Sequence, residues 1–197
     1  MNIEFNAERH EYRVNGLIVP SVTQVLSSVG LPDLSGIPAE LLEWKAGLGS
    51  AVHKATELDD LGDLDEESLD LAIKPYLEAY RKFKIESGFV PLGMEEAVYS
   101  KKYGFAGRLD RVGFFGHKSI LSLIDYKTGL VDVKTVGPQT SGYQTGWNEA
   151  NETKDHIKAR CALKLNKDAT YRLIRLDNKM DFQIFLNALN IYKWRNQ

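Results

Sequence analysis

Two aspartates and a lysine give the strongest chemical signal in this chain, and they fall between residues 105 and 127. Alternating apolar and polar residues in this stretch predict two antiparallel strands joined by a short turn. If Phe115 pairs with Ile120 across the turn, the same register brings Asp110 directly opposite Asp125. Opposed side chains have Cβ atoms about 4.5–5.5 Å apart, and like charges at that distance are destabilising unless something compensates them. A hard divalent cation such as Mg²⁺, which binds carboxylate oxygens, is the natural compensator.

Lys127 adds a cation to this pair of acids. It follows Asp125 by two positions, so both side chains lie on the same face of the strand. The strand is apolar on both faces, as in the centre of a sheet, which predicts that the charges are partly buried. An ion-pair ladder, in which Lys127, Arg108 and Arg111 neutralise the two acids, explains the same pattern without a metal. The residues alone leave both interpretations open, and a one-residue bulge would place the aspartates on opposite faces.

Helices and further strands surround this hairpin. A hairpin is predicted at Asn15-Gly16, and Ser21 with Gln24 has the spacing of a capping box at the start of a short helix. Further helices are expected over about 39–61, after Asp65 with a kink or break at Pro75, over 139–150 and over 181–194, with two more strands over 160–165 and 170–176. This order predicts an α/β fold in which a central mixed β-sheet, containing an antiparallel meander, is flanked by helices.

Length and composition restrict the class of protein. The 197 residues are 43% hydrophobic and 26% charged, which is enough for one core, and we expect a single domain over 1–197. No apolar run approaches the ~20 residues of a membrane span, and the N-terminal residues lack the apolar stretch of a secretory signal. The lone Cys161 excludes a disulfide framework and an iron–sulfur cluster held by cysteines of this chain alone. We therefore expect a cytoplasmic protein that does not bind membranes.

The net charge of −2 conceals an uneven distribution of charge. Residues 57–70 contain eight acids and neither Lys nor Arg, whereas residues 153–197 contain ten Lys or Arg and four acids. A basic lobe can bind a polyanion locally although the whole chain is negative. Clustered solvated charges explain the same distribution without any ligand.

The spacing Asp110-x14-Asp125-x-Lys127 resembles the PD-(D/E)XK nuclease superfamily, and more narrowly its branch of RecB-type nuclease domains and phage-type exonucleases. Leu109 stands where proline gives the superfamily its name. The resemblance extends over most of the chain and implies a restriction-endonuclease-like core. Other stretches that carry it are His10-x-Tyr12 to Ser21-Val22-Thr23, Gly49-x3-His53-x3-Glu57, Glu96-x-Val98 leading into Ala106-Gly107-Arg108-Leu109-Asp110, Ile124-Asp125-Tyr126-Lys127-Thr128-Gly129, Gln139-x3-Tyr143 and Ile191-Tyr192-Lys193-Trp194.

The resemblance implies a site that binds Mg²⁺ or Mn²⁺. His53 and Glu57 share a helix face, a pattern that by itself is typical of a surface pair. The resemblance makes His53 a metal ligand, with Glu57 supporting it or facing the substrate. The implied metal ligands are His53, Asp110, Asp125 and the carbonyl of Tyr126, and the implied catalytic residues are Asp110, Asp125, Lys127, Glu96, Gln139 and Tyr143.

The resemblance implies a metal-dependent DNA nuclease that hydrolyses phosphodiester bonds, as an exonuclease in phage or mobile-element recombination and DNA processing. The chain has no phosphate-binding loop for ATP, so no ATP is expected as a cofactor. Two alternatives stay open: a nuclease-like module that binds DNA ends or a partner without cutting, and a structure-specific endonuclease.

Single- or double-stranded DNA is the expected partner, in a bacterium or a phage-infected host cell. The resemblance also admits a single-strand annealing protein or a helicase as a partner, and an oligomer. The DNA-binding residues expected from charge and from the resemblance are Glu57, Arg108, Lys154, Lys158, Arg160, Lys164, Arg172 and Arg175.

Overall fold

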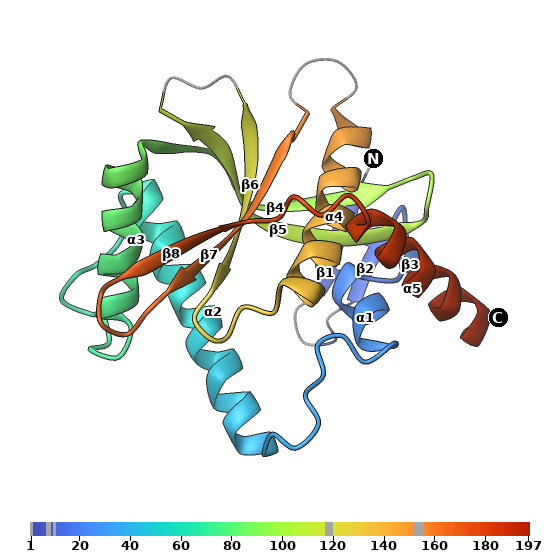
Figure 1. Cartoon of the computed structure of the whole chain (residues 1–197), viewed down its shortest axis with the longest axis horizontal. Coiled ribbons are helices and arrows are strands. Elements are labelled where there is room, and N and C mark those ends of the chain that lie inside the picture. The colour runs from blue at the N-terminus through green and yellow to red at the C-terminus, as the bar shows by residue number, and fades with distance from the viewer. Residues whose placement is uncertain (1, 7–8, 10, 117–119, 152–155) are drawn as a thin grey trace.

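The computed structural model of the chain describes residues 2–6, 9, 11–116, 120–151 and 156–197. Its main sheet has the strand order β4–β5–β6–β7–β8 (Figure 1). β6 and β7 run parallel, and the other neighbouring strands are antiparallel. The predicted α/β fold with a mixed sheet and an antiparallel meander is therefore confirmed. The strands are β4 (Phe89–Ser100), β5 (Phe105–Phe115), β6 (Leu121–Lys127), β7 (Ala159–Leu165) and β8 (Tyr171–Arg175).

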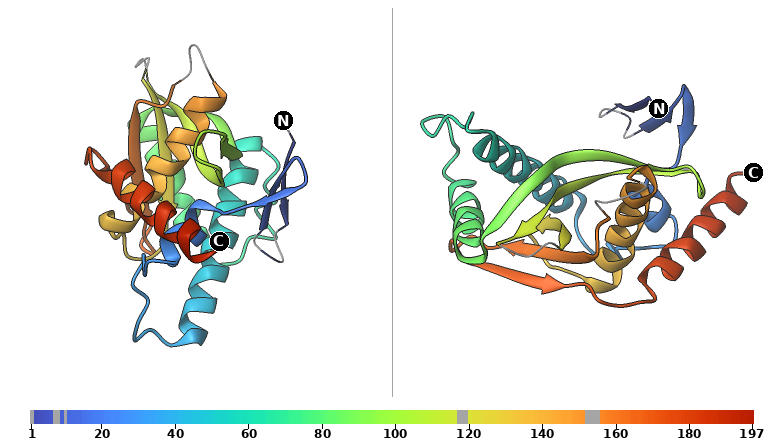
Figure 2. Two further views of the ribbon diagram at one scale, coloured as in Figure 1. Left: turned by 90° about the vertical axis from the view of Figure 1, so that its right-hand side faces the viewer. Right: turned by 90° about the horizontal axis from the view of Figure 1, so that it is seen from above.

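Helices cover both faces of this sheet (Figure 2). One face packs against α2 and α3 around Tyr80, Phe83 and Tyr126, and the other packs against α1, α4 and α5 around Leu123 and Phe185. No helix in the described part of the chain is long and apolar enough to cross a membrane. The helices are α1 (Val22–Ser27), α2 (Ala39–Leu61), α3 (Lys74–Ser87), α4 (Val133–Ala150) and α5 (Asp181–Arg195).

The register between β5 and β6 is the predicted one. Arg111 pairs with Ile124, and the ladder continues from there towards the turn. Asp110 and Asp125 are the next residues beyond this last pair, so both acids lie where the two strands separate. β6 lies between β5 and β7 at the centre of the sheet, which explains why it is apolar on both faces.

A second, three-stranded sheet precedes α1. The predicted hairpin turns at Asn15 and Gly16, both with the positive φ that its tight turn requires. Ser21 and Gln24 form the predicted capping box, each side chain accepting from the other residue's main-chain N–H. The first strand of this sheet was not among the predicted elements. The strands are β1 (Ile3–Asn6), β2 (Glu11–Val14) and β3 (Leu17–Val19), in that order across the sheet.

The helix expected after Asp65 starts later than predicted. α3 begins at Lys74, and the residues between Asp65 and Lys74 are bends and turns instead of helix. Pro75 therefore does not kink a longer helix. It lies in the first turn, where a missing N–H leaves no hydrogen bond unmade and the fixed φ suits a helix.

α4 starts six residues before the predicted position at Gln139. Asp132 caps its N-terminus, because the carboxylate accepts hydrogen bonds from the main-chain N–H of Lys134 at 3.0 Å and from the hydroxyl of Thr135 at 2.7 Å. The helix continues through Pro138, which has no N–H to give to the preceding turn. The cap at Asp132 thus explains the earlier start of the helix.

Two acids of the acidic stretch 57–70, at the C-terminal end of α2, are paired with cations of other elements. The side chain of Asp60 is 1% exposed and lies 2.7 Å from Lys84 Nζ and 2.9 Å from Arg111 Nε. Asp59 pairs with Lys84 at 3.1 Å and with Arg81 at 2.5 Å. These two acids are therefore neutralised by cations of α3 and β5, and they hold α2 against both elements.

Candidate metal and catalytic site

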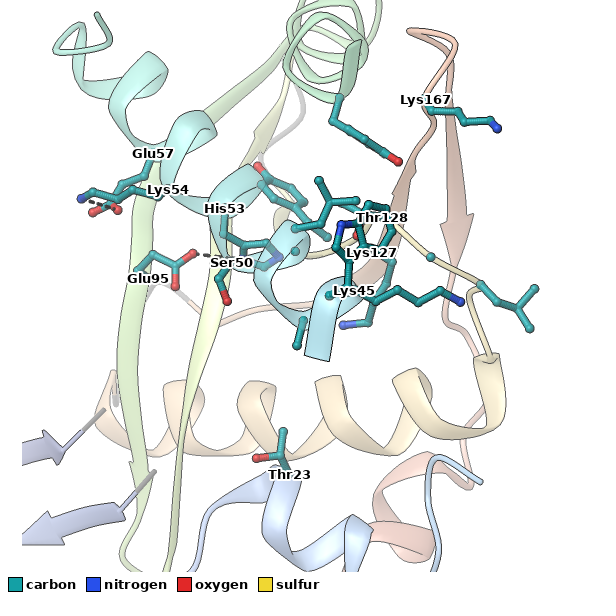
Figure 3. Close-up of a pocket in the computed structure, with 18 of the residues that line it drawn as sticks. Thr23, Lys45, Ser50, His53, Lys54, Glu57, Glu95, Lys127, Thr128 and Lys167 are labelled. Atoms are coloured by element: carbon teal, nitrogen blue, oxygen red, sulfur yellow. Dashed lines mark hydrogen bonds and ion pairs between the residues drawn. The ribbon is translucent and has the colours of Figure 1, made fainter. Parts of the chain in front are cut away.

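Three side chains from three elements meet beside the point where β5 and β6 separate. His53 comes from α2, Glu95 from β4 and Asp110 from β5, and one ligand atom of each lies within 4.8 Å of the other two. His53 Nδ1 is 3.4 Å from Glu95 Oε1 and 3.5 Å from Asp110 Oδ1. Figure 3 shows His53 facing Glu95 across the gap between helix and strand. We call these three residues the acidic triad.

Glu95, and not the predicted Glu96, is the acid that β4 contributes to this triad. β4 pairs with β5 through Glu96 opposite Leu109, which leaves Glu95 opposite Asp110. Glu95 has a left-handed φ of 51°, a local irregularity that alternation along a regular strand does not reveal. Glu96 is exposed, and the structure does not bring it into the triad. The register of β4 on β5 was the signal that could have found Glu95.

Asp125 and Lys127 form an ion pair next to the triad. Lys127 Nζ lies 2.5 Å from Asp125 Oδ2, and the Asp125 side chain is 1% exposed. Asp110 turns its second oxygen towards the same strand, where Oδ2 accepts a hydrogen bond of 2.6 Å from the main-chain N–H of Tyr126. The structure thus brings together Asp110, Asp125 and Lys127, as the register predicted.

α4 closes this site from the other face of the sheet. Gln139 Nε2 donates to the Tyr143 hydroxyl at 3.0 Å and to Asp125 Oδ1 at 3.4 Å. Tyr143 lies directly over Gly107, where an added Cβ would stand 2.5 Å from Tyr143 Cε1. A glycine at this position of β5 therefore lets the tyrosine ring approach the strand.

Arg111 supports the triad from behind. Its side chain is wholly buried, and Nη1 donates to the main-chain oxygen of Asp110 at 2.7 Å and to Glu95 Oε1 at 3.4 Å. Nε donates to Asp60 Oδ2 at 2.9 Å and Nη2 to Thr56 Oγ1 at 3.3 Å, which ties α2 to the strands. One guanidinium thus fixes the relative positions of α2, which carries His53, and the two strands that carry the acids.

The charges of the site shift the protonation of its members. Burial alone would lower the pKa of His53, but the carboxylates of Asp110 and Glu95 outweigh it and raise the pKa to about 9. Burial raises the pKa of Asp125, although the Lys127 ammonium opposes this and Asp110 adds to it. Burial likewise opposes the charge of Lys127, but Asp125 and Asp110 raise its pKa above the usual value. Lys127 therefore stays protonated at neutral pH.

This donor set suits a hard divalent cation. An imidazole nitrogen and two carboxylates converge, and oxygen-rich sites of this kind take Mg²⁺ or Mn²⁺. Among the predicted ligands, the structure brings His53 and Asp110 into the triad and puts Asp125 beside it. Tyr126 contributes a main-chain N–H to Asp110, and its ring packs in the core against Tyr80. The expected role of its carbonyl stays a prediction.

A cleft of about 1160 Å³ leads from solvent to the triad (Figure 3). α2 forms one wall, and the residues that follow β6 together with the β7–β8 turn form the other. Cations line it from both walls: Lys45 and Lys54 from α2, Lys127 from β6 and Lys167 from the turn. The cleft is thus suited to an anionic ligand that reaches the triad.

Two of the predicted DNA-binding residues form ion pairs beside this cleft. The predicted Glu57 lines the cleft but pairs with Lys54 at 3.0 Å. Arg108, also in the lining, lies 3.4 Å from Glu95. Lys158 precedes β7 and Arg175 ends β8, so both lie away from the edge of the sheet that carries Lys127. Neither residue lines the cleft.

Arg160, which was predicted to bind DNA, is buried in the structure. Its side chain is 9% exposed, pairs with Asp181 at 2.9 Å and donates to the Gly137 carbonyl at 2.6 Å, so its charge is used inside the fold. Arg160 instead joins β7 to α4 and α5. Lys154 lies outside the residues that the structure describes. Lys164 and Arg172 lie in register with Lys127 on the neighbouring strands.

Comparison with known proteins bears on the family of the chain. The model of the PD-(D/E)XK nuclease superfamily matches residues 37–183, a span that includes the triad and the Asp125–Lys127 pair. No curated protein matches the chain.

Solved structures resemble the chain at low identity. A protein from Eubacterium rectale, described as a candidate exonuclease, is 13% identical with a TM-score of 0.51, covering 77% of this chain and 65% of that one. The chain thus spans less than two thirds of that protein, and at this identity the likeness shows the fold alone. LHK-Exo, an alkaline exonuclease from Laribacter hongkongensis solved with dAMP, is 13% identical with a TM-score of 0.40, covering 90% of this chain and 87% of that one.

Proposed function

Because the chain belongs to the PD-(D/E)XK nuclease superfamily, we propose that it is a metal-dependent deoxyribonuclease that removes nucleotides from DNA ends. The observation that carries the proposal is the acidic triad of His53, Glu95 and Asp110, placed beside the Asp125–Lys127 ion pair at the end of a basic cleft. A phosphodiester is the bond whose hydrolysis uses all of these groups together.

His53, Glu95, Asp110 and Asp125 would hold a divalent cation. When bound there, Mg²⁺ or Mn²⁺ supplies a hydrolytic water of lowered pKa and neutralises charge on the scissile phosphate. The site is preorganised, because Arg111 holds the main-chain oxygen of Asp110 and the Tyr126 N–H holds its carboxylate. The acids therefore need little reorganisation to accept a cation.

Lys127 acts on the reacting phosphate. Its ammonium remains charged, is held against Asp125 and lines the cleft, so it can donate to a phosphate oxygen or to the attacking water. A fixed cation next to the reacting atoms stabilises the negative charge that develops in the transition state. Gln139 orients Asp125, and Tyr143 in turn accepts from Gln139.

A module that binds DNA ends without cutting is the second candidate function. It would have no use for two carboxylates held next to a third, since repulsion among them is destabilising without a cation. The complete set of acids, imidazole and lysine therefore favours catalysis. The proposal includes a biological setting, which is phage or mobile-element recombination inside a bacterial or infected cell. An annealing protein or a helicase would be the partner there.

Digestion of end-labelled linear DNA and of closed circular DNA with Mg²⁺ or Mn²⁺ tests the proposal. We expect progressive loss of the linear DNA, no cutting of the circle, and no activity in EDTA. Cutting of the circle would replace the exonuclease with an endonuclease. Binding of DNA ends without any hydrolysis would favour the non-cutting module.

A further inference from the structure

Three cations form one row across the end of the main sheet. Lys127 of β6 pairs in register with Lys164 of β7, and Lys164 pairs with Arg172 of β8. Paired residues on neighbouring strands point to the same side of a sheet, so the three side chains lie side by side on one face. The row starts at the lysine proposed for catalysis and ends at the outer strand. We call it the basic row.

The basic row lies beyond the part of this face that α4 covers. Ala162 and Ile174, the preceding pair of β7 and β8, are packed under Val131 and Val136. Two residues further along β7, Lys164 is only half-buried, and Arg172 is exposed. The row therefore faces solvent directly beside the packed end of α4.

Lys164 and Arg172 have no acidic partner among the residues that the structure describes. The ion pairs in this region involve other cations, such as Lys127 with Asp125 and Arg175 with Asp177. Like charges on directly opposed positions are destabilising unless something compensates them. Two neighbouring cations beside a third, without an acid of their own, are suited to an anion from outside the chain.

We propose that Lys164 and Arg172 bind the phosphates of a DNA strand whose scissile phosphate lies at Lys127. Neighbouring strands are about 4.8 Å apart, so the row extends about 10 Å from β6 to β8. A row of this length can contact consecutive phosphates of one strand. This inference rests on the proposed function and adds the direction in which the strand leaves the site.

The same two strands offer a matched control. Lys158 precedes β7, and its N–H donates to Leu121 O at the start of β6, whereas Arg175 ends β8 opposite Cys161. Lys158 is six residues from Lys164, or about 20 Å along an extended strand. Both control cations are exposed, like Arg172. If any positive charge on these strands attracted DNA, removing either pair of cations would weaken binding. If DNA follows the basic row from Lys127, only removal of Lys164 and Arg172 weakens it.

The test measures the affinity of the full chain for a labelled single strand and a labelled blunt duplex, over a salt series in Ca²⁺. The variants are the double substitution Lys164→Ala/Arg172→Ala and the control Lys158→Ala/Arg175→Ala, with thermal melts to verify folding. For the first variant we expect about tenfold weaker binding or more, and a slope of log K against log salt lower by roughly 0.7–0.9 per lost contact. The control should keep the wild-type slope and affinity.

The outcomes separate this inference from the function on which it rests. Wild-type binding and cleavage with an unchanged slope in Lys164→Ala/Arg172→Ala would overturn the basic row and leave the nuclease intact. An equal loss in the control variant would also overturn it, because the effect would then be general. Failure of the wild-type chain to bind or cut DNA would contradict the proposed function together with the inference.

Discussion

Lys127 Nζ lies 2.5 Å from Asp125 Oδ2, and the pair is held at the edge of a cleft while the carboxylate itself is 1% exposed. A buried carboxylate without its cation is costly, so Asp125 depends on Lys127. This dependence makes the pair testable through stability as well as through activity.

The substitution Lys127→Met should leave Asp125 as an uncompensated buried carboxylate. Burial and Asp110 already raise the pKa of Asp125, and loss of the ammonium that opposes them raises it further. A carboxyl whose folded pKa lies above its unfolded value destabilises the fold when ionised, so acid should restore stability. We expect a loss of roughly 1–3 kcal/mol at pH 8 that shrinks towards pH 5, measured by urea unfolding at both values. Lys127→Arg is the control, and an equal loss at both pH values would contradict this account of the pair.

Mg²⁺ or Mn²⁺ should raise the melting temperature of the wild-type chain, since a ligand that binds the native state stabilises it. Glu95→Gln should remove most of that increase, because Glu95 belongs to the triad. The neighbouring Glu96→Gln changes charge by the same amount at an exposed position outside the triad and should keep the increase. If instead Glu96→Gln lost the increase and Glu95→Gln kept it, Glu95 would not be a ligand of the metal.

The thermal shift caused by Mg²⁺ should be larger at pH 9 than at pH 7. Without metal, His53 has a pKa of about 9, so a cation must displace a proton from the imidazole below that pH. The raised pKa also means that His53 stabilises the metal-free fold below its unfolded value of 6.5, and that this contribution is lost as the pH rises through about 9. Thermal melts with and without Mg²⁺ at both pH values check this. His53→Ala should lose the difference, and a larger shift at pH 7 in the wild type would contradict it.

Arg111→Met should destabilise the fold by about 3–5 kcal/mol, because it removes a buried guanidinium from Asp60, Glu95 and the main-chain oxygen of Asp110 at once. Both Arg111 and the Asp60 carboxylate are almost wholly buried. Arg81→Met is the matched control, since it also breaks an arginine–aspartate pair of α2 but at a side chain that is 37% exposed. The control should cost about 1 kcal/mol or less. Urea unfolding compares the two, and similar costs would show that the Arg111 network is not a stabilising centre.

The sequence allowed the centre of this site to be predicted because register is a local property. The hairpin of β5 and β6 determines which residues face each other, so Asp110, Asp125 and Lys127 could be brought together without knowledge of the rest of the fold. The long helix α2 was predicted with its observed bounds, and it carries His53.

The rest depended on features that alternation along a strand and composition do not reveal. The left-handed φ at Glu95 changes which of two adjacent glutamates reaches the triad. Arg160 was expected to bind DNA because it lies in a segment rich in Lys and Arg, but tertiary packing places Asp181 against it. The charge distribution pointed to the C-terminal third as a whole, whereas strand pairing singles out Lys164 and Arg172.

Cleavage of a linear, end-labelled DNA with Mg²⁺ by wild type, Asp110→Asn and Glu96→Gln tests the central claim most directly, which is that the acidic triad is the place of DNA hydrolysis. Asp110 is the acid that links the triad to β6 through the Tyr126 N–H, so its substitution should reduce the rate by 10²-fold or more. Glu96→Gln should cut at the wild-type rate, and EDTA should stop cleavage by the wild type and by Glu96→Gln. Cleavage by Asp110→Asn at a rate near that of the wild type, or wild-type cleavage that persists in EDTA, would contradict the claim.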